Sequence, residues 1–312
     1  MKFSRLILLT LLAACVVFAF GSARAEEMQG EYVENEWNYV DQSMDVEHGI
    51  PEDVTGALAR IREAGVLRVA IEPYFPPQEF IDESLPKGEQ IVGPDVELAR
   101  LIAEKMGVKL KLVPMDFSLV LTSVNDGECD LAISALMYTP GRAVTNTFSK
   151  GYYFGDEGSA VGILVQMRNL EKITSIDSLK DKIIVAQSGS LHEALAAEKV
   201  HEYHEFRRMN TIQEVYLAVA NRWADAAVVN VAAAKAYIES HPKQKLALVP
   251  GLQLQIAKEM QGDRVAGKKG EVQLMYFVNG VIDQVLANDQ YNQWIAYYQD
   301  YWDRISGETD KK

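Results

Sequence analysis

Apolar and polar residues follow two periods along most of the chain, a period of two that is typical of strands and a period near 3.6 that is typical of helices. In the first half, short β-prone runs alternate with segments whose apolar residues fall on one helical face. This β-α-β-α-β order predicts a parallel sheet flanked by helices. The expected elements are strands over residues 68–71, 108–113 and 129–133 and helices over residues 95–106 and 117–125.

Local signals mark the ends of the first predicted helix. Asp95 follows Gly93-Pro94 and has a side chain of the type that caps helix N-termini, so we expect it to be the N-cap. Gly107 follows the last apolar residue of the helical face. We expect it to end the helix, because glycine readily adopts the left-handed conformation found at helix ends.

The second half of the chain repeats the alternation with different residues, which predicts a second α/β unit. The Thr211–Glu214 pair predicts a capping box at one of its helices. The last forty residues return to a helical period with an aromatic stripe, which we expect to be a packing face. The expected elements are strands over 182–186 and 225–229 and helices that end at 199, 222 and 239, and the stripe consists of Trp294, Tyr298 and Trp302.

Length and composition agree with two compact units. The chain has 312 residues, of which 48% are hydrophobic and 24% are charged, a balance typical of globular proteins and not of disordered or fibrous ones. At roughly 150 residues per domain, this length is enough for two domains with separate cores. The formal net charge of −13 argues against a nucleic-acid partner, because phosphate backbones bind basic surfaces.

The first 25 residues have the features of a secretory signal peptide. Basic residues precede the apolar run 6–20, and small residues at 22–25 fit cleavage after Ala25. We therefore expect export of a cleaved chain. Two alternatives stay open: a lipobox at 12–15 would leave a lipid-anchored Cys15, and the segment could remain as an uncleaved anchor.

Cleavage after Ala25 would leave a strongly acidic chain without an internal disulfide. It leaves 28 of the 31 basic residues and all 44 acidic ones, a net charge of −16, with Cys129 as the one cysteine. Residues 26–50 are acidic, lack Lys and Arg, and include aromatic residues. We expect a partly ordered leader that lies against the protein, with a functional arm as the alternative. Residues 306–312 are expected to be a polar tail.

Five short segments follow one another in an order that is specific, although each segment alone is a weak signal. They are residues 65–70 with Pro77 and Phe80, residues 93–99, residues 127–134, residues 139–142 with 148–153, and residues 225–230. In this combination the chain resembles the periplasmic solute-binding proteins of ABC importers, in the cluster that binds polar amino acids (bacterial extracellular solute-binding protein family 3). The resemblance covers about residues 51–302.

The resemblance implies an α/β fold of the periplasmic-binding-protein type II, a two-lobed clamshell of two parallel-rich sheets flanked by helices. Two crossing strands would join the lobes. Lobe 1 is expected at residues 51–157 plus 266–305, and lobe 2 at residues 158–265. The ligand is expected in the cleft at the carboxyl ends of the strands, where closure of the lobes buries it. The resemblance also implies a periplasmic monomer.

Arg142 is the residue that the resemblance places on the ligand carboxylate. It follows a helix-start signal, so its planar guanidinium could form two parallel hydrogen bonds to a carboxylate while nearby amides add partial positive charge. Phe75 and Phe117 are expected to flank the ligand, with core packing as the alternative for both. Further contacts are expected from Ser188, Gly189, Ser190 and Thr139, the last of which has helix capping as its alternative.

Departures from the family pattern leave the ligand open. Asn230 stands where similar amino-acid binders usually carry an Asp for the α-ammonium group, and a buried ammonium without an anion is costly. Glu72, at the end of the first strand, is the candidate that could compensate, with a solvated rim carboxylate as its alternative. Ala135 and Met137 also make the pocket less polar. A carboxylate-bearing solute without an α-amine is therefore an alternative to an amino acid.

These expectations describe an exported substrate-binding protein that captures a small carboxylate-bearing solute and delivers it to an ABC permease in the inner membrane, without covalent chemistry. A soluble sensor for a signalling partner and a clamshell enzyme such as a dehydratase are the alternatives. Asn230 disfavours the enzyme, because acid–base catalysis needs a titratable group in the cleft. No cofactor or metal is expected, because the histidines are scattered and neither a phosphate loop nor a G-x-S-x-G elbow occurs.

Overall fold

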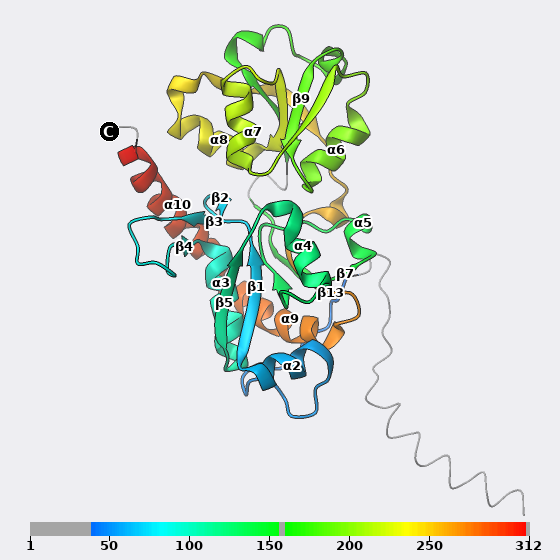
Figure 1. Ribbon diagram of the computed structural model, residues 1–312, viewed down its shortest axis with the longest axis vertical. Helices are drawn as coiled ribbons and strands as arrows, with labels where there is room; N and C mark the ends of the chain where they lie inside the picture. Colours follow the sequence, from blue (N-terminus) through cyan, green and yellow to red (C-terminus); the bar gives the residue numbers. More distant parts are fainter. Residues whose placement is uncertain (1–38, 156–159, 310–312) are drawn as a thin grey trace, which may run out of the picture. The chain divides into compact units, whose positions relative to one another are not determined.

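Two five-stranded sheets organise the part of the chain that the structure describes. The computed structural model describes residues 39–155 and 160–309, all within one compact unit. Figure 1 shows helices packed on the faces of both sheets. The expected signal peptide, both candidate processing sites and the first part of the acidic leader lie outside the described residues.

The first sheet consists of β1 (Val66–Ile71), β5 (Lys109–Pro114), β6 (Leu131–Ala132), β7 (Asn146–Tyr153) and β13 (Asp263–Lys268). Its strand order is β5-β1-β6-β13-β7. β1 is parallel to both of its neighbours, as the β-α-β-α-β pattern predicted. β13 is antiparallel to β6 and to β7, so the chain enters this sheet a second time from the opposite direction.

Helices cover both faces of the first sheet. One face packs against α2 (Gly56–Ala64), α3 (Pro94–Met106) and α9 (Val272–Ala287), and the other face packs against α4 (Phe117–Asn125). β1 contributes to both cores, because successive side chains of a strand point to opposite faces. Val69 belongs to the core under α3 and α9, whereas its neighbour Ala70 belongs to the core under α4.

The second sheet consists of β8 (Val161–Gln166), β9 (Ile183–Gln187), β10 (Glu205–Met209), β11 (Ala226–Asn230) and β12 (Leu246–Leu254). Its order is β10-β9-β11-β8-β12, with β10, β9 and β11 parallel and β8 antiparallel to its neighbours. The flanking helices are α6 (Leu191–Lys199), α7 (Ile212–Ala220) and α8 (Val231–Ser240). We call the two sheets with their helices the first and second lobes. The α/β alternation predicted for both halves is confirmed.

A small antiparallel sheet, which the sequence did not predict, projects from the first lobe between β1 and α3. It consists of β2 (Tyr74–Phe75), β3 (Glu79–Ile81) and β4 (Ile91–Val92), and we call residues 73–92 the lip. The remaining short elements are α5 (Pro140–Ala143) and the 3-10 helices Met167–Asn169, Ile176–Leu179, Pro242–Gln244 and Lys258–Met260.

Several helix ends form as the sequence predicted. Gly107 follows α3 in the left-handed conformation, with φ of 70°. The capping box at α7 is present: the Thr211 hydroxyl accepts a hydrogen bond from the Glu214 backbone N–H, and the Glu214 carboxylate accepts one from the Thr211 backbone N–H. Ser190 caps α6 by accepting a hydrogen bond from the Glu193 N–H at 3.1 Å.

The predicted N-cap of α3 is wrong. Pro94 is the first helical residue and Gly93 the cap, because the fixed φ of proline suits the first turn of a helix. Asp95 is instead fully buried in the first lobe. Its carboxylate accepts hydrogen bonds from the Tyr152 hydroxyl at 2.9 Å, the Tyr291 hydroxyl at 2.6 Å and the Ala135 backbone N–H at 2.7 Å. It therefore ties α3 to elements far away in the sequence.

Replacing Gly93 with alanine is expected to reduce the free energy of unfolding by about 2–3 kcal/mol, measured by denaturant titration. Gly93 has φ of 134°, and a Cβ built on it would lie 2.1 Å from the Gln78 carbonyl oxygen. Gly127→Ala is the matched control, because Gly127 also has positive φ, 77°, but its Cβ would meet no atom within 4 Å. The control should cost only about 1 kcal/mol. Equal losses in the two variants would contradict the backbone clash.

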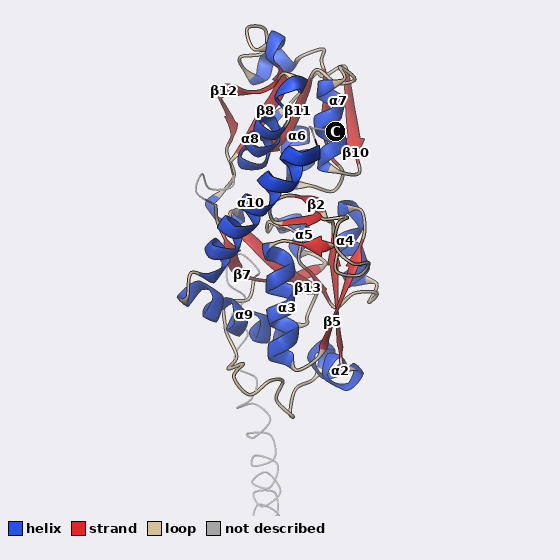
Figure 2. Cartoon of the chain, turned by 90° about the vertical axis from the view of Figure 1, so that its left-hand side faces the viewer, coloured by secondary structure: helices blue, strands red, loops and turns tan. Residues whose placement is uncertain are grey.

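The last helix, α10 (Gln290–Thr309), contacts α3 and α9 of the first lobe and α8 of the second (Figure 2). The predicted aromatic stripe does pack: Phe80 of the lip meets the rings of Tyr298 and Trp302 at centroid distances of 6.2 Å and 5.1 Å. Within the described residues, no helix is long and apolar enough to cross a membrane.

Two segment boundaries differ from those expected. β13 pairs with the first sheet from Asp263 onward, so residues 263–265 belong to the first lobe and not to the second. Residues 306–309, expected in a polar tail, continue the α10 helix.

The described part of the acidic leader lies against the first lobe: Val46 is buried in its core, and the Val40 N–H donates to the Phe148 carbonyl at 2.9 Å. Val40 is buried in the same core, so the burial of apolar side chains holds this part of the leader against the first lobe.

Candidate ligand-binding site

Five of the nine candidate site residues meet in one small cavity between the lobes. The cavity has a volume of about 30 Å³, which is room for a water molecule or two. A solute of amino-acid size would therefore need the lobes to separate here. The candidates that line it are Glu72, Phe75, Phe117, Arg142 and Ser190, together with Glu79, Ser134, Ala135, Met137, Gln187, Leu191 and His192.

The Arg142 guanidinium connects the two lobes through backbone carbonyls. Its Nη1 donates to the Met137 carbonyl at 2.7 Å and its Nη2 donates to the Gly189 carbonyl of the second lobe at 2.9 Å. No carboxylate of the described residues forms an ion pair with it. Burial lowers the pKa of Arg142 to about 10, so the side chain stays charged at neutral pH. A cation with only neutral acceptors is well suited to receive an anion.

Local structure positions this arginine. Thr139 precedes Pro140 at the start of α5, and its hydroxyl accepts a hydrogen bond from the Arg142 backbone N–H at 3.1 Å. The sequence left helix capping and ligand contact open for Thr139, and in this arrangement it acts as the cap. The Arg142 Cζ lies 5.7 Å from the centroid of the Phe117 ring, so this wall residue also contacts the cation.

Two buried carboxylates line the same cavity. Glu72 directly follows β1 and is 1% exposed, and Glu79 on β3 is fully buried. They share Ser134, whose hydroxyl accepts from the Glu72 N–H at 3.0 Å and donates to Glu79 Oε1 at 3.0 Å. Glu72 is therefore not a solvated rim residue here. Glu79 also interacts with the buried carboxyl of Asp95.

Burial controls the charge of this acidic pair. It raises the pKa of Glu72 to about 8, helped by the nearby charge of Asp116 and opposed by the hydrogen bond from Gln187. Burial also raises the pKa of Glu79 well above its usual value, and the charges of Asp95 and Glu72 act in the same direction. Glu72 therefore favours the neutral form at pH 7, burial acts on Glu79 in the same direction, and a cationic group placed beside them would favour the charged form.

The remaining candidates do not line the cavity. Gly189 has φ of 74°, and a Cβ there would lie 3.0 Å from the Ser118 Cα, so glycine allows the loop to approach α4 closely. Asn230 caps α8, with its side-chain oxygen accepting from the Ala233 N–H at 3.0 Å. Ser188 donates its backbone N–H to the Met209 carbonyl at 2.8 Å.

The sequence missed four polar residues of the cavity, Glu79, Ser134, Gln187 and His192. Both ring nitrogens of His192 are buried without a hydrogen-bond partner among the described residues. Burial, with a smaller contribution from the charge of Arg142, lowers the pKa of His192 to about 4, so the ring is neutral at pH 7. His192 lies two residues after Ser190, a candidate that lines the cavity, and this closeness is the signal that could have found it.

Within residues 39–155 and 160–309, no group of three or more His, Cys, Asp and Glu side chains is placed to bind a metal ion.

Residues 67–301 match the profile of the bacterial extracellular solute-binding proteins, family 3. The chain belongs to this family. The match spans both lobes, and it agrees with the resemblance seen in the five sequence segments.

Individual relatives support the same assignment. The arginine-binding extracellular protein ArtP of Bacillus subtilis is 28% identical over 165 residues, 53% of this chain and 62% of ArtP, so the alignment spans less than two thirds of that protein. The putative ABC transporter arginine-binding protein 2 of Escherichia coli K12 is 25% identical over 235 residues, 74% of this chain and 91% of that protein.

A solved structure supports the fold. The crystal structure of the amino acid ABC transporter substrate-binding protein AbpA from Streptococcus pneumoniae, bound to L-arginine, has a TM-score of 0.68 and 30% identity, and the alignment covers 78% of this chain and 98% of AbpA. The expected two-lobed α/β fold is confirmed by this likeness.

Proposed function

We propose that this protein is the exported substrate-binding component of an ABC importer and that it captures a small amino acid or a related carboxylate-bearing solute. The observation that carries the proposal is the Arg142 guanidinium, which is positioned between the lobes and has two backbone carbonyls but no carboxylate of the described residues as acceptors. The family supports a substrate-binding role. Such binding requires no covalent chemistry.

The solute carboxylate binds Arg142 when the lobes separate. The Gly189 carbonyl then leaves Nη2, and a planar carboxylate can replace neutral acceptors with two charge-assisted hydrogen bonds. Phe75 and Phe117 cover the solute and exclude water, which strengthens these bonds. The second lobe then closes over the solute, so that the solute contacts both lobes.

The other end of the solute carries a positive charge. Glu72 and Glu79 are the acids of the cavity, and burial makes each costly to ionise without a cation. A guanidinium or ammonium group beside them removes that cost. Asn230 brings no charge, so the acidic pair is the anionic partner that the cavity offers. The arginine named for ArtP and bound to AbpA combines a carboxylate with such a cation.

Delivery follows from the two-lobed arrangement. The solute stabilises the closed arrangement of the lobes because it contacts both, and it thereby shifts the population from open to closed. The closed, monomeric protein presents both lobes to a permease of the inner membrane. The expected signal peptide and the extracellular family support a periplasmic location after cleavage at Ala25.

A thermal-shift comparison of four matched solutes tests the proposal. L-Arginine is expected to raise the Tm, whereas agmatine, which lacks the carboxylate, and citrulline, which lacks the side-chain charge, should give much smaller shifts. 5-Guanidinopentanoate, which lacks only the α-amine, should retain most of the shift because Asn230 is uncharged. An equal shift with agmatine would contradict carboxylate recognition. No shift with these solutes or with a wider set of amino acids, keto acids and dicarboxylates would contradict solute binding.

A further inference from the structure

A second and much larger space lies beside the cleft cavity. It has a volume of about 660 Å³, within the range of roughly 300–1,000 Å³ that is typical of small-molecule sites. Its walls come from the lip, from the last turns of α10, and from α7 and α8 of the second lobe. We call this space the α10 chamber. Phe75 lies between the chamber and the cleft cavity and lines both.

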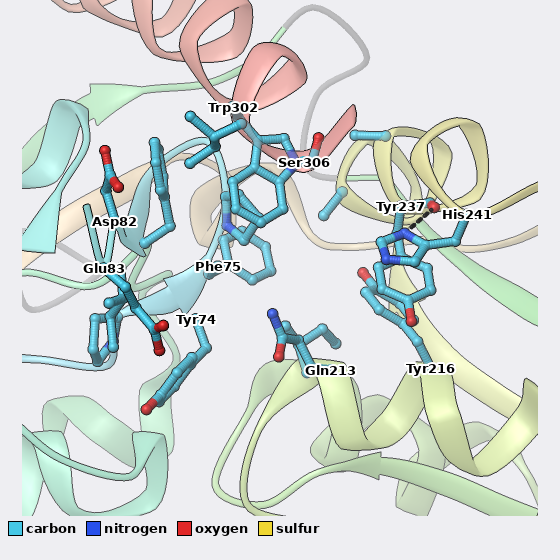
Figure 3. A pocket seen from close by; sticks show the side chains of 18 of the residues that line it. Tyr74, Phe75, Asp82, Glu83, Gln213, Tyr216, Tyr237, His241, Trp302 and Ser306 are labelled. Atoms are coloured by element: carbon cyan, nitrogen blue, oxygen red, sulfur yellow. Dashed lines mark hydrogen bonds between the residues drawn. The ribbon is translucent and has the colours of Figure 1, made fainter. Parts of the chain in front are cut away.

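Aromatic rings from both lobes face the chamber. Trp302 of α10 and Phe75 of the lip lie opposite Tyr237 and His241 of the second lobe (Figure 3). Tyr237 stacks on His241 with ring centroids 4.2 Å apart and an interplanar angle of 12°. Tyr216 extends this stack, with its ring centroid 4.2 Å from that of Tyr237. Faces of aromatic rings attract cations, and they also provide apolar contact area.

The charged side chains that line the chamber are acidic. Asp82 and Glu83 line it, and no Lys or Arg is found among its described lining residues. Hydrogen bonds from Ser84 and from the Tyr301 hydroxyl lower the pKa of Asp82, so this carboxylate is ionised at neutral pH. Anionic oxygens and aromatic faces together favour an organic cation over an anion or a neutral molecule.

We propose that the α10 chamber is a second ligand site, which binds a small organic cation with an apolar body. The site is separate from the Arg142 cavity, and its ligand needs no carboxylate. The cation lies near Asp82 and Glu83, and the apolar body lies between Trp302 and the Tyr237–His241 stack.

Isothermal titration calorimetry with three matched probes tests this site. The probes are 2-phenylethylammonium, its neutral analogue 2-phenylethanol and its anionic analogue phenylacetate. The amine is expected to bind saturably and at least tenfold more tightly than either analogue. Absence of amine binding, or equal binding of phenylacetate, would overturn the proposal.

A pair of variants on α8 places the amine in the chamber. Ala236 lines the chamber, so Ala236→Trp should place a bulky ring in it and weaken amine binding at least tenfold, whereas Ala232→Trp on the exposed face of the same helix should change the affinity less than twofold. Equal effects of the two variants would overturn the location. Glu83→Gln should weaken the amine about threefold, and Glu89→Gln, an exposed lip acid outside the chamber, should not.

A variant of the cleft cavity tests whether the amine binds there and not in the chamber. Glu72 lines the cleft cavity and not the chamber. Glu72→Gln removes an acid that would hold an ammonium group in the cleft, but the amine should bind this variant as it binds the wild type. Loss of amine binding in Glu72→Gln would show that the probe occupies the cleft, and it would overturn the proposal for the chamber without affecting the proposed solute binding. Unchanged amine binding together with weaker L-arginine binding in this variant agrees with two separate sites.

Discussion

Replacing Arg142 with alanine is expected to lower the affinity for the preferred solute by about 100- to 1,000-fold. Two charge-assisted hydrogen bonds to a carboxylate are lost, which corresponds to about 3–4 kcal/mol. The measurement is isothermal titration calorimetry with the solute that gives the largest thermal shift. Arg142→Lys should have an intermediate effect, because lysine keeps the charge but not the planar pair of donors.

An exposed arginine serves as the control for this variant. Arg100 on α3 forms an ion pair with Glu97 at 2.7 Å, and its side chain is 56% exposed. Arg100→Ala should leave the solute affinity unchanged within twofold, because surface ion pairs contribute little and Arg100 does not line the cavity. An Arg142→Ala protein that keeps full affinity would remove Arg142 from the binding site.

The contribution of Glu72 to the free energy of unfolding of the solute-free protein is expected to fall by about 4 kcal/mol as the pH rises from 5 to 9. The pKa of Glu72 is about 8 in the folded protein, above its usual 4.5. The folded state therefore binds a proton more tightly than the unfolded state. This contribution is fully present below the unfolded pKa and is lost as the pH rises through the folded pKa. Glu79 has a raised pKa for the same reason and acts in the same direction.

Glu72→Gln separates this effect from the rest of the pH profile. Glutamine resembles the protonated carboxyl, so the variant should lose much less stability between pH 5 and pH 9, measured by urea titration at each pH. Glu104→Gln is the control, because Glu104 is an exposed acid on α3. A Glu72→Gln profile as steep as that of the wild type would contradict a buried, protonated Glu72.

The candidate site was only partly predictable, and the reason differs from residue to residue. Arg142 lies in a segment that carries the family resemblance, Phe75 lies between residues of another, and Phe117 was expected from the family pattern alone; all three line the cavity. Glu79 carried no signal, because its strand β3 pairs with β2 and β4 in a lip that shows no sustained period. Asp95 gave a misleading signal, since an Asp beside a helix start fits a cap as well as a buried acceptor.

The sequence by itself determined the alternation of the main strands and helices, the helix ends at Gly107 and Thr211, and the family. These features depend on period, on neighbours within a few residues and on short ordered motifs, all of which are written along the chain. Only the tertiary structure decided that Arg142 meets Gly189, that Glu72 and Glu79 are buried together, and that α10 closes a chamber with the second lobe. Those contacts join residues far apart in the sequence, and they arise from how two separately folded lobes pack, which no local period encodes.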